Sequence, residues 1–379
     1  MSRRTLLPSL FFLASATAPL AAAEPPEIAN NQKTVTVMTR NLYVGADLLP
    51  PILAIASGDP AAIVAAVSET FGKVQFTDFN ARAEGIAREI EAARPDLVGL
   101  QEVTTWRSQT PADFVPGNAE HVEYDFLAIL LQALDARGLH YGVVAHEVGF
   151  DAEFPGFLSE AAAEAGELSD IRLTDGEAIL ARTDLRVSDL KLSNARTGHF
   201  ETNIVVPISE TEFFVLLRGW ASVDAKIRGK SFRFISTHLE AESEEVREAQ
   251  ALEILAGPAV TELPVVFVAD ANSNANGGST SPAYSAFIGD GFTDPWPEAH
   301  PGSIVSTCCN AELLTNPTLP DPADDEGRID LILYRAAGDF ETLDAGLFGT
   351  DPQTDRVSNG VALIWPSDHA GVAATLQIR

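Results

Sequence analysis

The sequence predicts an α/β fold with mixed sheets, because short apolar segments alternate with segments of helical periodicity along the chain. The apolar segments are rich in β-branched residues, and most are bounded by polar residues, glycine or proline, which is typical of buried strands. These strands are expected over residues 34–43, 96–103, 177–182, 213–223, 231–239, 263–270, 328–335 and 370–378.

Three segments between these strands predict helices. In residues 80–96 the apolar side chains recur every three or four positions and share one face. Asn80 is expected to cap the start of this helix, and Pro95 is expected to end it. Two further helices are expected over residues 121–138 and 243–257, because each periodic segment ends at a glycine.

The first 23 residues have the pattern of an export signal. Arg3 and Arg4 precede the apolar stretch "LLPSLFFLASATAPL", and the small residues "AAA" precede Glu24. We therefore expect a secreted or periplasmic protein, and "SRRTLL" also matches a twin-arginine signal loosely. Beyond the signal, no stretch of about 20 uninterrupted apolar residues predicts a transmembrane segment.

The rest of the chain is expected to form one catalytic domain, residues 24–379, because no low-complexity linker or repeat divides it. We expect this domain to be a monomer. Three segments have the composition of insertions near functional sites: residues 46–78, 150–175 and 296–327.

Charge and cysteine content restrict the classes of partner. The formal net charge is −29, and loss of Arg3 and Arg4 with the signal would lower it to −31. Bulk charge therefore does not favour capture of a polyanion, and a phosphate site must be local. The only cysteines, Cys308 and Cys309, are adjacent, so a vicinal disulfide and two buried thiols are both open. Neither alternative gives a disulfide framework or a zinc site.

Polar residues capable of metal or phosphate chemistry recur where the predicted strands end. Each of them alone has an ordinary explanation as a turn residue, a helix cap or a surface group. Their repetition is informative, because α/β sheets bind ligands beyond their strand ends. The residues are Asn41, Glu102, His238, Asp270, Asn272, Asp330, Asp368 and His369.

This set of residues fits the hydrolysis of a phosphate ester. A hard cation such as Mg²⁺ needs carboxylate and amide oxygens, which Glu102 and the neighbouring Asn41 can supply. Asp270 is a candidate base for the attacking water. Donors to the phosphoryl oxygens can come from Asn272, His238 and His369.

Six motifs resemble those of the endonuclease/exonuclease/phosphatase superfamily, which has the deoxyribonuclease-I-like fold. In chain order they are "MTRNLY", "PDLVGLQEV", "FISTHLEAE", "VADANS", "RIDLIL" and "SDHAGV", and they span residues 34–378. One departure is Ala269, which stands where the family usually has glycine before the aspartate. The resemblance implies a four-layer α/β sandwich, with two mixed β-sheets face to face and helices outside.

The resemblance also implies a role for each site residue. Glu102 would be the principal ligand of Mg²⁺, or of another divalent cation such as Mn²⁺ or Ca²⁺, with Asn41 and Asp368 close to the metal. Asp270 would orient or deprotonate the attacking water, and Asn272 would hold a phosphate oxygen.

Two histidines would bind and protonate the phosphate, namely His238 and His369. Asp330 would pair with His369, and Asp175 is our candidate for the carboxylate that pairs with His238. Arg218 can approach the phosphate, although a structural salt bridge is the commoner role for such a residue.

The fold and motifs leave the substrate open among nucleic acid, a phospholipid head group and a soluble phosphodiester. A total of 25 basic residues disfavours a nonspecific nuclease. "THLEAESEE" resembles a stretch of bacterial sphingomyelinases, and the apolar residues 149–158 are the candidate membrane contact, although a packed loop is the commoner structure. A catalytically inactive binding module and a solute-binding protein are disfavoured by the complete polar set.

Overall fold

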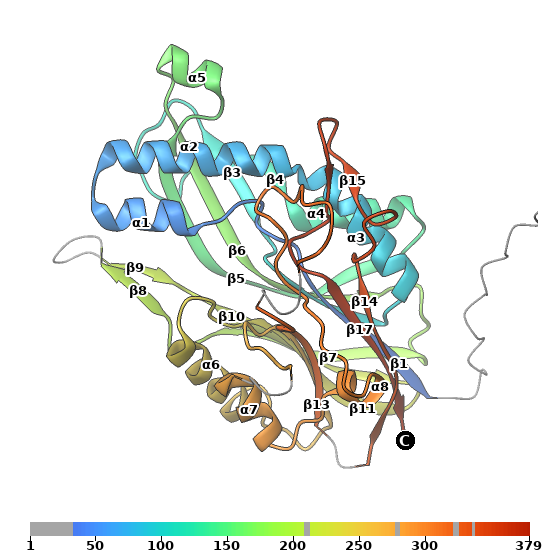
Figure 1. The fold of residues 1–379 in the computed structure, drawn as a ribbon. Helices are drawn as coiled ribbons and strands as arrows, with labels where there is room; N and C mark the ends of the chain where they lie inside the picture. Colours follow the sequence, from blue (N-terminus) through green and yellow to red (C-terminus); the bar gives the residue numbers. More distant parts are fainter. Residues whose placement is uncertain (1–32, 208–212, 277–280, 321–325, 336–337) are drawn as a thin grey trace, which may run out of the picture. The chain divides into compact units, whose positions relative to one another are not determined.

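The computed structural model of the protein describes residues 33–207, 213–276, 281–320, 326–335 and 338–379 (Figure 1). One compact unit comprises Lys33–Arg379. The predicted export signal over residues 1–23 lies outside the described residues, so secretion stays a prediction.

The first of two large sheets has eight strands in the described part of the chain, in the order β14-β17-β1-β2-β6-β3-β4, with β5 also paired to β6. It is mixed, because β1 runs parallel to β2 and antiparallel to β17. Its strands are β1 (Thr34–Asn41), β2 (Leu97–Gln101), β3 (Thr105–Gln109), β4 (His121–Asp125), β5 (Tyr141–Gly156), β6 (Ser169–Arg182), β14 (Phe340–Phe348) and β17 (Gly371–Ile378).

The second large sheet, in the order β13-β12-β11-β10-β7, is mixed as well, because only β11 and β12 run parallel to each other. Its strands are β7 (Leu190–His199), β10 (Gly219–Ile227), β11 (Lys230–His238), β12 (Val265–Asp270) and β13 (Asp330–Arg335). Two short hairpins accompany the sheets: β8 (Ile204–Pro207) with β9 (Phe213–Leu216), and β15 (Val357–Ser358) with β16 (Leu363–Ile364).

Helices cover the outer faces of both sheets (Figure 1). The outer face of the first sheet is covered by α3 (Phe79–Ala93) and α4 (Phe126–Ala136), and that of the second by α6 (Glu244–Ala256) and α7 (Pro282–Gly289), whereas α1 (Leu49–Ser57) and α2 (Pro60–Thr77) pack together against β5. Two shorter helices are α5 (Glu160–Ala165) and α8 (Pro295–Ala299).

Three apolar clusters separate the four layers. Along β1 the side chains alternate, so Val37 packs between the sheets and Met38 packs under the helices of the first sheet. Phe267 of β12 packs against Phe287 of α7, beyond the second sheet. The four-layer α/β sandwich predicted from the sequence is therefore confirmed.

Some predicted elements differ from the observed ones. Residues 121–125 form β4, and only the rest of the predicted helix is helical, because the Asp125 side chain accepts a hydrogen bond from Ala128 N and starts α4 there. The helix predicted over 80–96 is capped by Asp78, not by Asn80, because the Asp78 carboxylate accepts from Asn80 N. The strand predicted over 213–223 is divided into β9 and β10.

The three predicted insertions have different structures. Residues 46–78 contain α1 and α2, which pack against each other as a helical hairpin. Residues 150–175 are mostly strand, because β5 extends to Gly156 and β6 begins at Ser169, with α5 between them. Most of 296–327 has no regular structure after α8, and residues 321–325 lie outside the described part.

Two smaller observations bear on the sequence predictions. The structure records Cys308 and Cys309 as a vicinal disulfide, which is one of the two alternatives left open. Among the described residues, no helix is both long enough and apolar enough to cross a membrane.

Candidate active site

The candidate site forms where neighbouring parallel strands end together. Asn41 ends β1 and Glu102 follows β2, and these two strands are parallel neighbours in the first sheet. His238 ends β11 and Asp270 ends β12, and they are direct partners in the register of the second sheet. The two sheets face each other, so the four side chains meet at a common edge.

Asp270 lies at the centre of the site and is buried. Its Oδ2 lies 2.9 Å from Asn41 Nδ2, 3.2 Å from His238 Nε2 and 3.5 Å from His369 Nε2. Its Oδ1 accepts a hydrogen bond from Asn272 N at 3.1 Å. Burial alone would raise the pKa of Asp270, but the two imidazoles hold the pKa of this carboxyl well below its usual range. Asp270 is therefore ionised at neutral pH.

His369 is paired with a carboxylate on its other side. Its Nδ1 lies 2.8 Å from Oδ2 of Asp330, which is buried at the start of β13. Burial alone would lower the pKa of His369, but Asp330, Asp270 and Asp368 together raise this pKa well above its ordinary value. The imidazole is therefore held in its cationic form.

Asn41 positions the two carboxylates of the site. Its Nδ2 donates to Glu102 Oε1 at 2.9 Å and to Asp270 Oδ2 at 2.9 Å, and its Oδ1 accepts from Tyr43 N at 2.7 Å. Asn41 therefore holds both carboxylates in place, and the metal contact that the sequence predicts for it stays a prediction. Glu102 is fixed on its second oxygen as well, because Oε2 accepts from Val44 N at 2.6 Å.

Asp368 adds a third carboxylate to this edge. Its Oδ1 accepts from Ser367 Oγ at 3.3 Å and lies 3.9 Å from His369 Nε2. Burial raises the pKa of Asp368 to about 6, and repulsion from Glu102 and Asp270 contributes to this increase. The site therefore carries more negative charge than its own histidines neutralise.

This donor set fits a divalent cation. One ligand atom from each of Glu102, His238 and Asp270 lies within 4.8 Å of the others, and the same holds for Asp270, Asp330 and His369. A cation would relieve the repulsion that raises the pKa of Asp368, and carboxylate oxygens are the ligands that Mg²⁺, Mn²⁺ and Ca²⁺ prefer.

The predicted pairing of Asp175 with His238 is wrong in this structure. Asp175 Oδ1 accepts a hydrogen bond from Thr104 Oγ1 at 2.8 Å, and the carboxylate beside His238 is Asp270. His238 Nδ1 is buried and has no hydrogen-bond partner among the described residues. Burial and repulsion from Glu102 raise the pKa of Asp175 to about 7, so this side chain still belongs to the surroundings of the site.

Asn272 lies beside His238, and Arg218 lies beside Glu240. Asn272 Nδ2 lies 3.0 Å from His238 Nε2 and donates to Leu239 O at 2.9 Å, which places the amide beside the imidazole. Arg218 Nε lies 3.6 Å from Glu240 Oε2, which is the structural salt bridge that the sequence favoured for this arginine.

Sequence reasoning missed the buried charges that hold the site together. Arg40 Nη2 and Nε each lie 2.9 Å from an oxygen of Glu89, and Nη1 donates to His369 O at 2.5 Å. Arg82 donates to Leu42 O at 2.5 Å and to Pro366 O at 3.2 Å. The sequence pattern that could have revealed them is the position of Arg82 and Glu89, which are seven residues apart and lie on the apolar face of α3.

Fold and site together define a protein of the deoxyribonuclease-I-like class with an acidic and histidine-rich centre. The chain belongs to the Endonuclease/Exonuclease/phosphatase family, whose model matches residues 68–369. This match includes all the site residues except Asn41.

Two solved structures from Bacteroides thetaiotaomicron resemble this chain over most of its length. An endonuclease/exonuclease/phosphatase family protein is 18% identical, with a TM-score of 0.52, and the alignment covers 92% of this chain and 99% of that one. A mannosyl-6-phosphatase is 19% identical, with a TM-score of 0.51. The alignment covers 90% of this chain and 99% of that one. At this identity the likeness shows the fold. Comparison with curated proteins gave no significant match.

Proposed function

We propose that the protein is an exported phosphodiesterase that depends on a divalent cation. The observation that supports this most strongly is the position of Asp270, whose Oδ2 lies 3.2 Å from His238 Nε2 and 3.5 Å from His369 Nε2. Hydrolysis of a phosphate ester needs an oriented water and cationic donors to the phosphoryl oxygens at one point. This arrangement supplies both types of group.

Asp270 orients the attacking water in this proposal. Because its carboxylate stays ionised at neutral pH, it can accept a hydrogen bond from water and direct the oxygen lone pair toward phosphorus. Asn41 and the backbone amide of Asn272 fix the two carboxylate oxygens, so the water would meet an acceptor that is already aligned.

His369 is the cationic donor. Its position between Asp330 and Asp270 keeps the imidazole protonated, so it can donate to a phosphoryl oxygen and pass a proton to the leaving oxygen. Asp330 fixes the ring orientation through Nδ1. His238 Nε2 and Asn272 Nδ2 lie 3.0 Å apart on the other side of Asp270, where one of them can donate to a phosphoryl oxygen.

Glu102 and Asp368 would hold the divalent cation. A bound Mg²⁺, Mn²⁺ or Ca²⁺ would supply positive charge to the phosphoryl oxygens during attack. Oxygen ligands favour these hard cations over softer ones.

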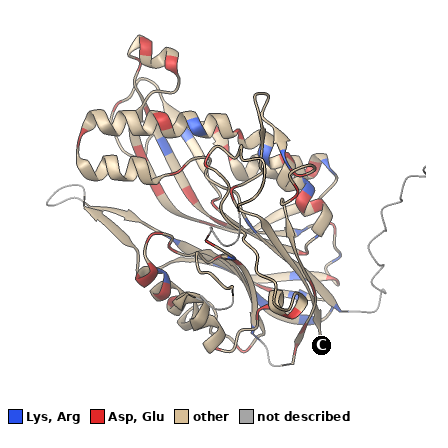
Figure 2. Ribbon diagram, in the orientation of Figure 1, with Lys and Arg blue, Asp and Glu red and all other residues tan. Residues whose placement is uncertain are grey.

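The charge distribution favours a small or lipid phosphodiester over long nucleic acid. Lys and Arg are scattered among Asp and Glu over the described chain, and acidic residues dominate α5 and α6 (Figure 2). A polyanion held by counterion release needs several Lys or Arg along one path.

Hydrolysis of bis-p-nitrophenyl phosphate tests the proposal. We expect turnover with Mg²⁺, loss of turnover with EDTA, and a loss of at least about a hundredfold in the His238→Ala variant. His121→Ala is the matched control, because the His121 side chain is 76% exposed and lies outside the site. An unchanged rate in His238→Ala would contradict the assignment. Parallel assays on plasmid DNA, sphingomyelin and inositol phosphates would then identify the substrate class.

A further inference from the structure

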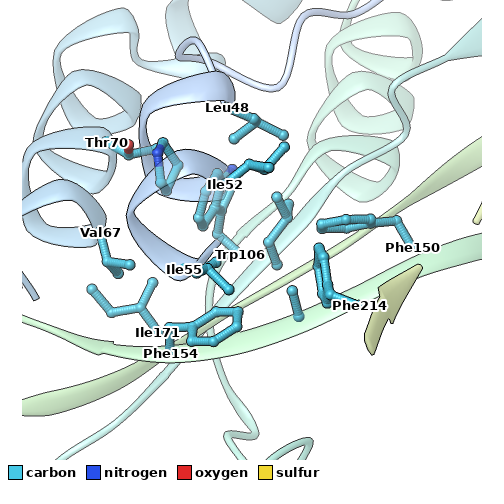
Figure 3. Close-up of a pocket in the computed structure, with 13 residues that line it drawn as sticks. Leu48, Ile52, Ile55, Val67, Thr70, Trp106, Phe150, Phe154, Ile171 and Phe214 are labelled. Atoms are coloured by element: carbon cyan, nitrogen blue, oxygen red, sulfur yellow. The ribbon is translucent and has the colours of Figure 1, made fainter. Parts of the chain in front are cut away.

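An apolar cavity of about 50 Å³ lies between the α1–α2 hairpin and the strands β3, β5 and β6 (Figure 3). Its walls include Ile52 and Ile55 from α1, Trp106 from β3, and Phe150 and Phe154 from β5. Phe214 of β9 closes one side, because its ring lies edge-on to the rings of Phe150 and Phe154, at centroid distances of 5.3 and 6.1 Å.

Almost no polar atom faces this cavity. Among the residues that line it, only Thr70 and Trp106 carry polar side-chain atoms, and the indole N–H of Trp106 is already donated to Val44 O at 3.1 Å. A polar or charged ligand would lose its hydration there without gaining hydrogen bonds. The cavity therefore suits a hydrocarbon group.

Two residues of the cavity wall lie on the same strand, β6, as Asp175. Alternate residues of a strand share a face, so Asp175, Leu173 and Ile171 lie in a row. At about 3.3 Å per residue, Leu173 lies roughly 7 Å beyond Asp175, and Ile171 roughly 13 Å beyond it. The last two residues line the cavity, whereas Asp175 binds Thr104 beside Glu102.

The register of β5 against β6 places the cavity wall next to Asp175. Phe150 is paired with Asp175, and Phe154 is paired with Ile171. A residue of the cavity wall is therefore the direct cross-strand neighbour of a carboxylate beside the active site. A second connection runs through Val44, whose carbonyl accepts from Trp106 and whose amide donates to Glu102 Oε2 at 2.6 Å.

We propose that this cavity is a subsite for the aliphatic group of a phosphodiester whose phosphate lies beside Asp270 and His369. The inference rests on the proposed function and specifies its substrate class, an ester with an alkyl or acyl group on the side of the phosphate that faces β6. The hydrocarbon is retained by desolvation, and the phosphate is retained by the polar groups at the strand ends.

Two elements of the wall also carry exposed apolar side chains. Leu53 on α1 is 60% exposed, and Phe213 on β9 is 61% exposed. These residues flank Ile52 and Phe214, which face the cavity. Exposed apolar side chains on both elements are the kind of surface that meets a lipid surface or a micelle.

The volume of the cavity limits the length of alkyl chain that can be buried in it. One water-sized group occupies about 10–15 Å³ of cavity volume. A cavity of about 50 Å³ therefore holds roughly four such groups. The effect of chain length should therefore increase over about the first four carbons and then level off.

A series of alkyl p-nitrophenyl phosphates tests the subsite. With methyl, butyl and octyl esters below their micelle-forming concentrations, we expect kcat/KM to rise at least about tenfold from methyl to butyl and little from butyl to octyl, because each buried methylene contributes about fourfold. The same octyl ester in phosphatidylcholine vesicles distinguishes the sources: a faster reaction in vesicles assigns a membrane lipid, and a faster reaction of the monomer assigns a soluble ester. Equal rates along the series in both forms would overturn the proposal.

A variant that fills the cavity provides the matched comparison. Ala152 lines the cavity opposite Leu173, so Ala152→Leu should lower the butyl-to-methyl ratio of kcat/KM toward one. The control is Ala163→Leu on α5, an exposed position outside the cavity, which should keep the wild-type ratio. Each ratio is taken within one protein preparation, so the amount of folded enzyme cancels. An unchanged ratio in Ala152→Leu would overturn the proposal.

Binding measured without catalysis separates this inference from the proposed function. By titration calorimetry, butyl phosphate should bind at least about tenfold more tightly than methyl phosphate. If bis-p-nitrophenyl phosphate is not hydrolysed but this difference is present, the phosphodiesterase assignment fails and the subsite stands. If hydrolysis occurs but neither binding nor rate depends on chain length, the subsite fails and the enzyme assignment stands.

Discussion

His369 Nδ1 lies 2.8 Å from Asp330 Oδ2, and both side chains are buried. Asp330 comes from the start of β13, whereas His369 comes from the loop before β17, so the pair joins the second sheet to the first. A carboxylate in this position orients the ring and keeps it protonated. Asp330 thereby makes the opposite nitrogen of His369, which faces Asp270, a proton donor.

Replacing Asp330 with asparagine should weaken His369 as a proton donor. We expect kcat/KM for bis-p-nitrophenyl phosphate to fall by roughly 10- to 100-fold, because partners of this kind contribute about that much. Because the negative charge raises the pKa of His369, its loss should also move the alkaline limb of the pH–rate profile to lower pH. Asp339→Asn, at an exposed position, is the control. A variant with wild-type rate and an unmoved alkaline limb would show that Asp330 has no such role.

Asp175 should make the protein less stable as the pH rises. Its pKa is raised from 3.8 in the unfolded chain to about 7 in the native protein, so the native state binds more protons between these values. The free energy of unfolding therefore falls as the pH increases through that window. In EDTA at about pH 8, Asp175→Asn should be more stable than wild type by on the order of 1 kcal/mol or more.

Urea unfolding at a series of pH values measures this contribution. Between about pH 4 and pH 7 the wild-type curve should fall more steeply than the Asp175→Asn curve, because asparagine can accept the Thr104 hydrogen bond without a charge. Parallel curves for the two proteins would show that the Asp175 carboxyl does not titrate differently in the folded state.

The buried pair of Arg40 and Glu89 should contribute strongly to stability. Glu89→Gln leaves the Arg40 guanidinium buried without its negatively charged partner. Such a change typically lowers the free energy of unfolding by about 3–5 kcal/mol. Glu69→Gln is the matched control, because Glu69 is 71% exposed in its contact with Lys73 and such pairs contribute at most about 1 kcal/mol. Chemical denaturation measures both variants, and equal midpoints would contradict the role assigned to the buried pair.

A divalent cation should stabilise the folded protein independently of catalysis. At a cation concentration about a hundred times its dissociation constant, the free energy of unfolding should increase by about 2.7 kcal/mol relative to EDTA. Glu102→Gln should reduce this increase, because one of the proposed ligands then carries no charge. If Mg²⁺, Mn²⁺ and Ca²⁺ all leave unfolding unchanged, the carboxylates do not form a cation site.

The strands and the main site residues could be predicted from the sequence because both are encoded locally. The segment "VVFVAD" shows a buried strand and the carboxylate at its end together, and the parallel arrangement of neighbouring strands then brings such ends to one edge. The same reasoning fails where a residue's partner is far away in sequence. The bridge that the Asn41 amide forms between Glu102 and Asp270, which lie 61 and 229 residues away, was not predicted.

The errors in helix boundaries and in the buried charges have a similar origin. Residues 121–125 continue the pattern of the following helix, but pairing with β3 makes them a strand, and that pairing is tertiary. Arg82 and Glu89 lie on the apolar face of α3, but their partners, the Leu42 carbonyl and Arg40, are distant in sequence. The partner of His238 was also sought in β6, whereas the sheet register places Asp270 beside it.

The rate of bis-p-nitrophenyl phosphate hydrolysis by Asp270→Asn, with Mg²⁺ present, is the most direct test of the central claim. Asparagine keeps the shape of the side chain but removes the charge that lies between His238 and His369. We predict that kcat/KM falls by about 10²- to 10⁴-fold, the range typical for loss of a group that handles the attacking water. A folded Asp270→Asn protein that hydrolyses the ester at the wild-type rate would contradict the account.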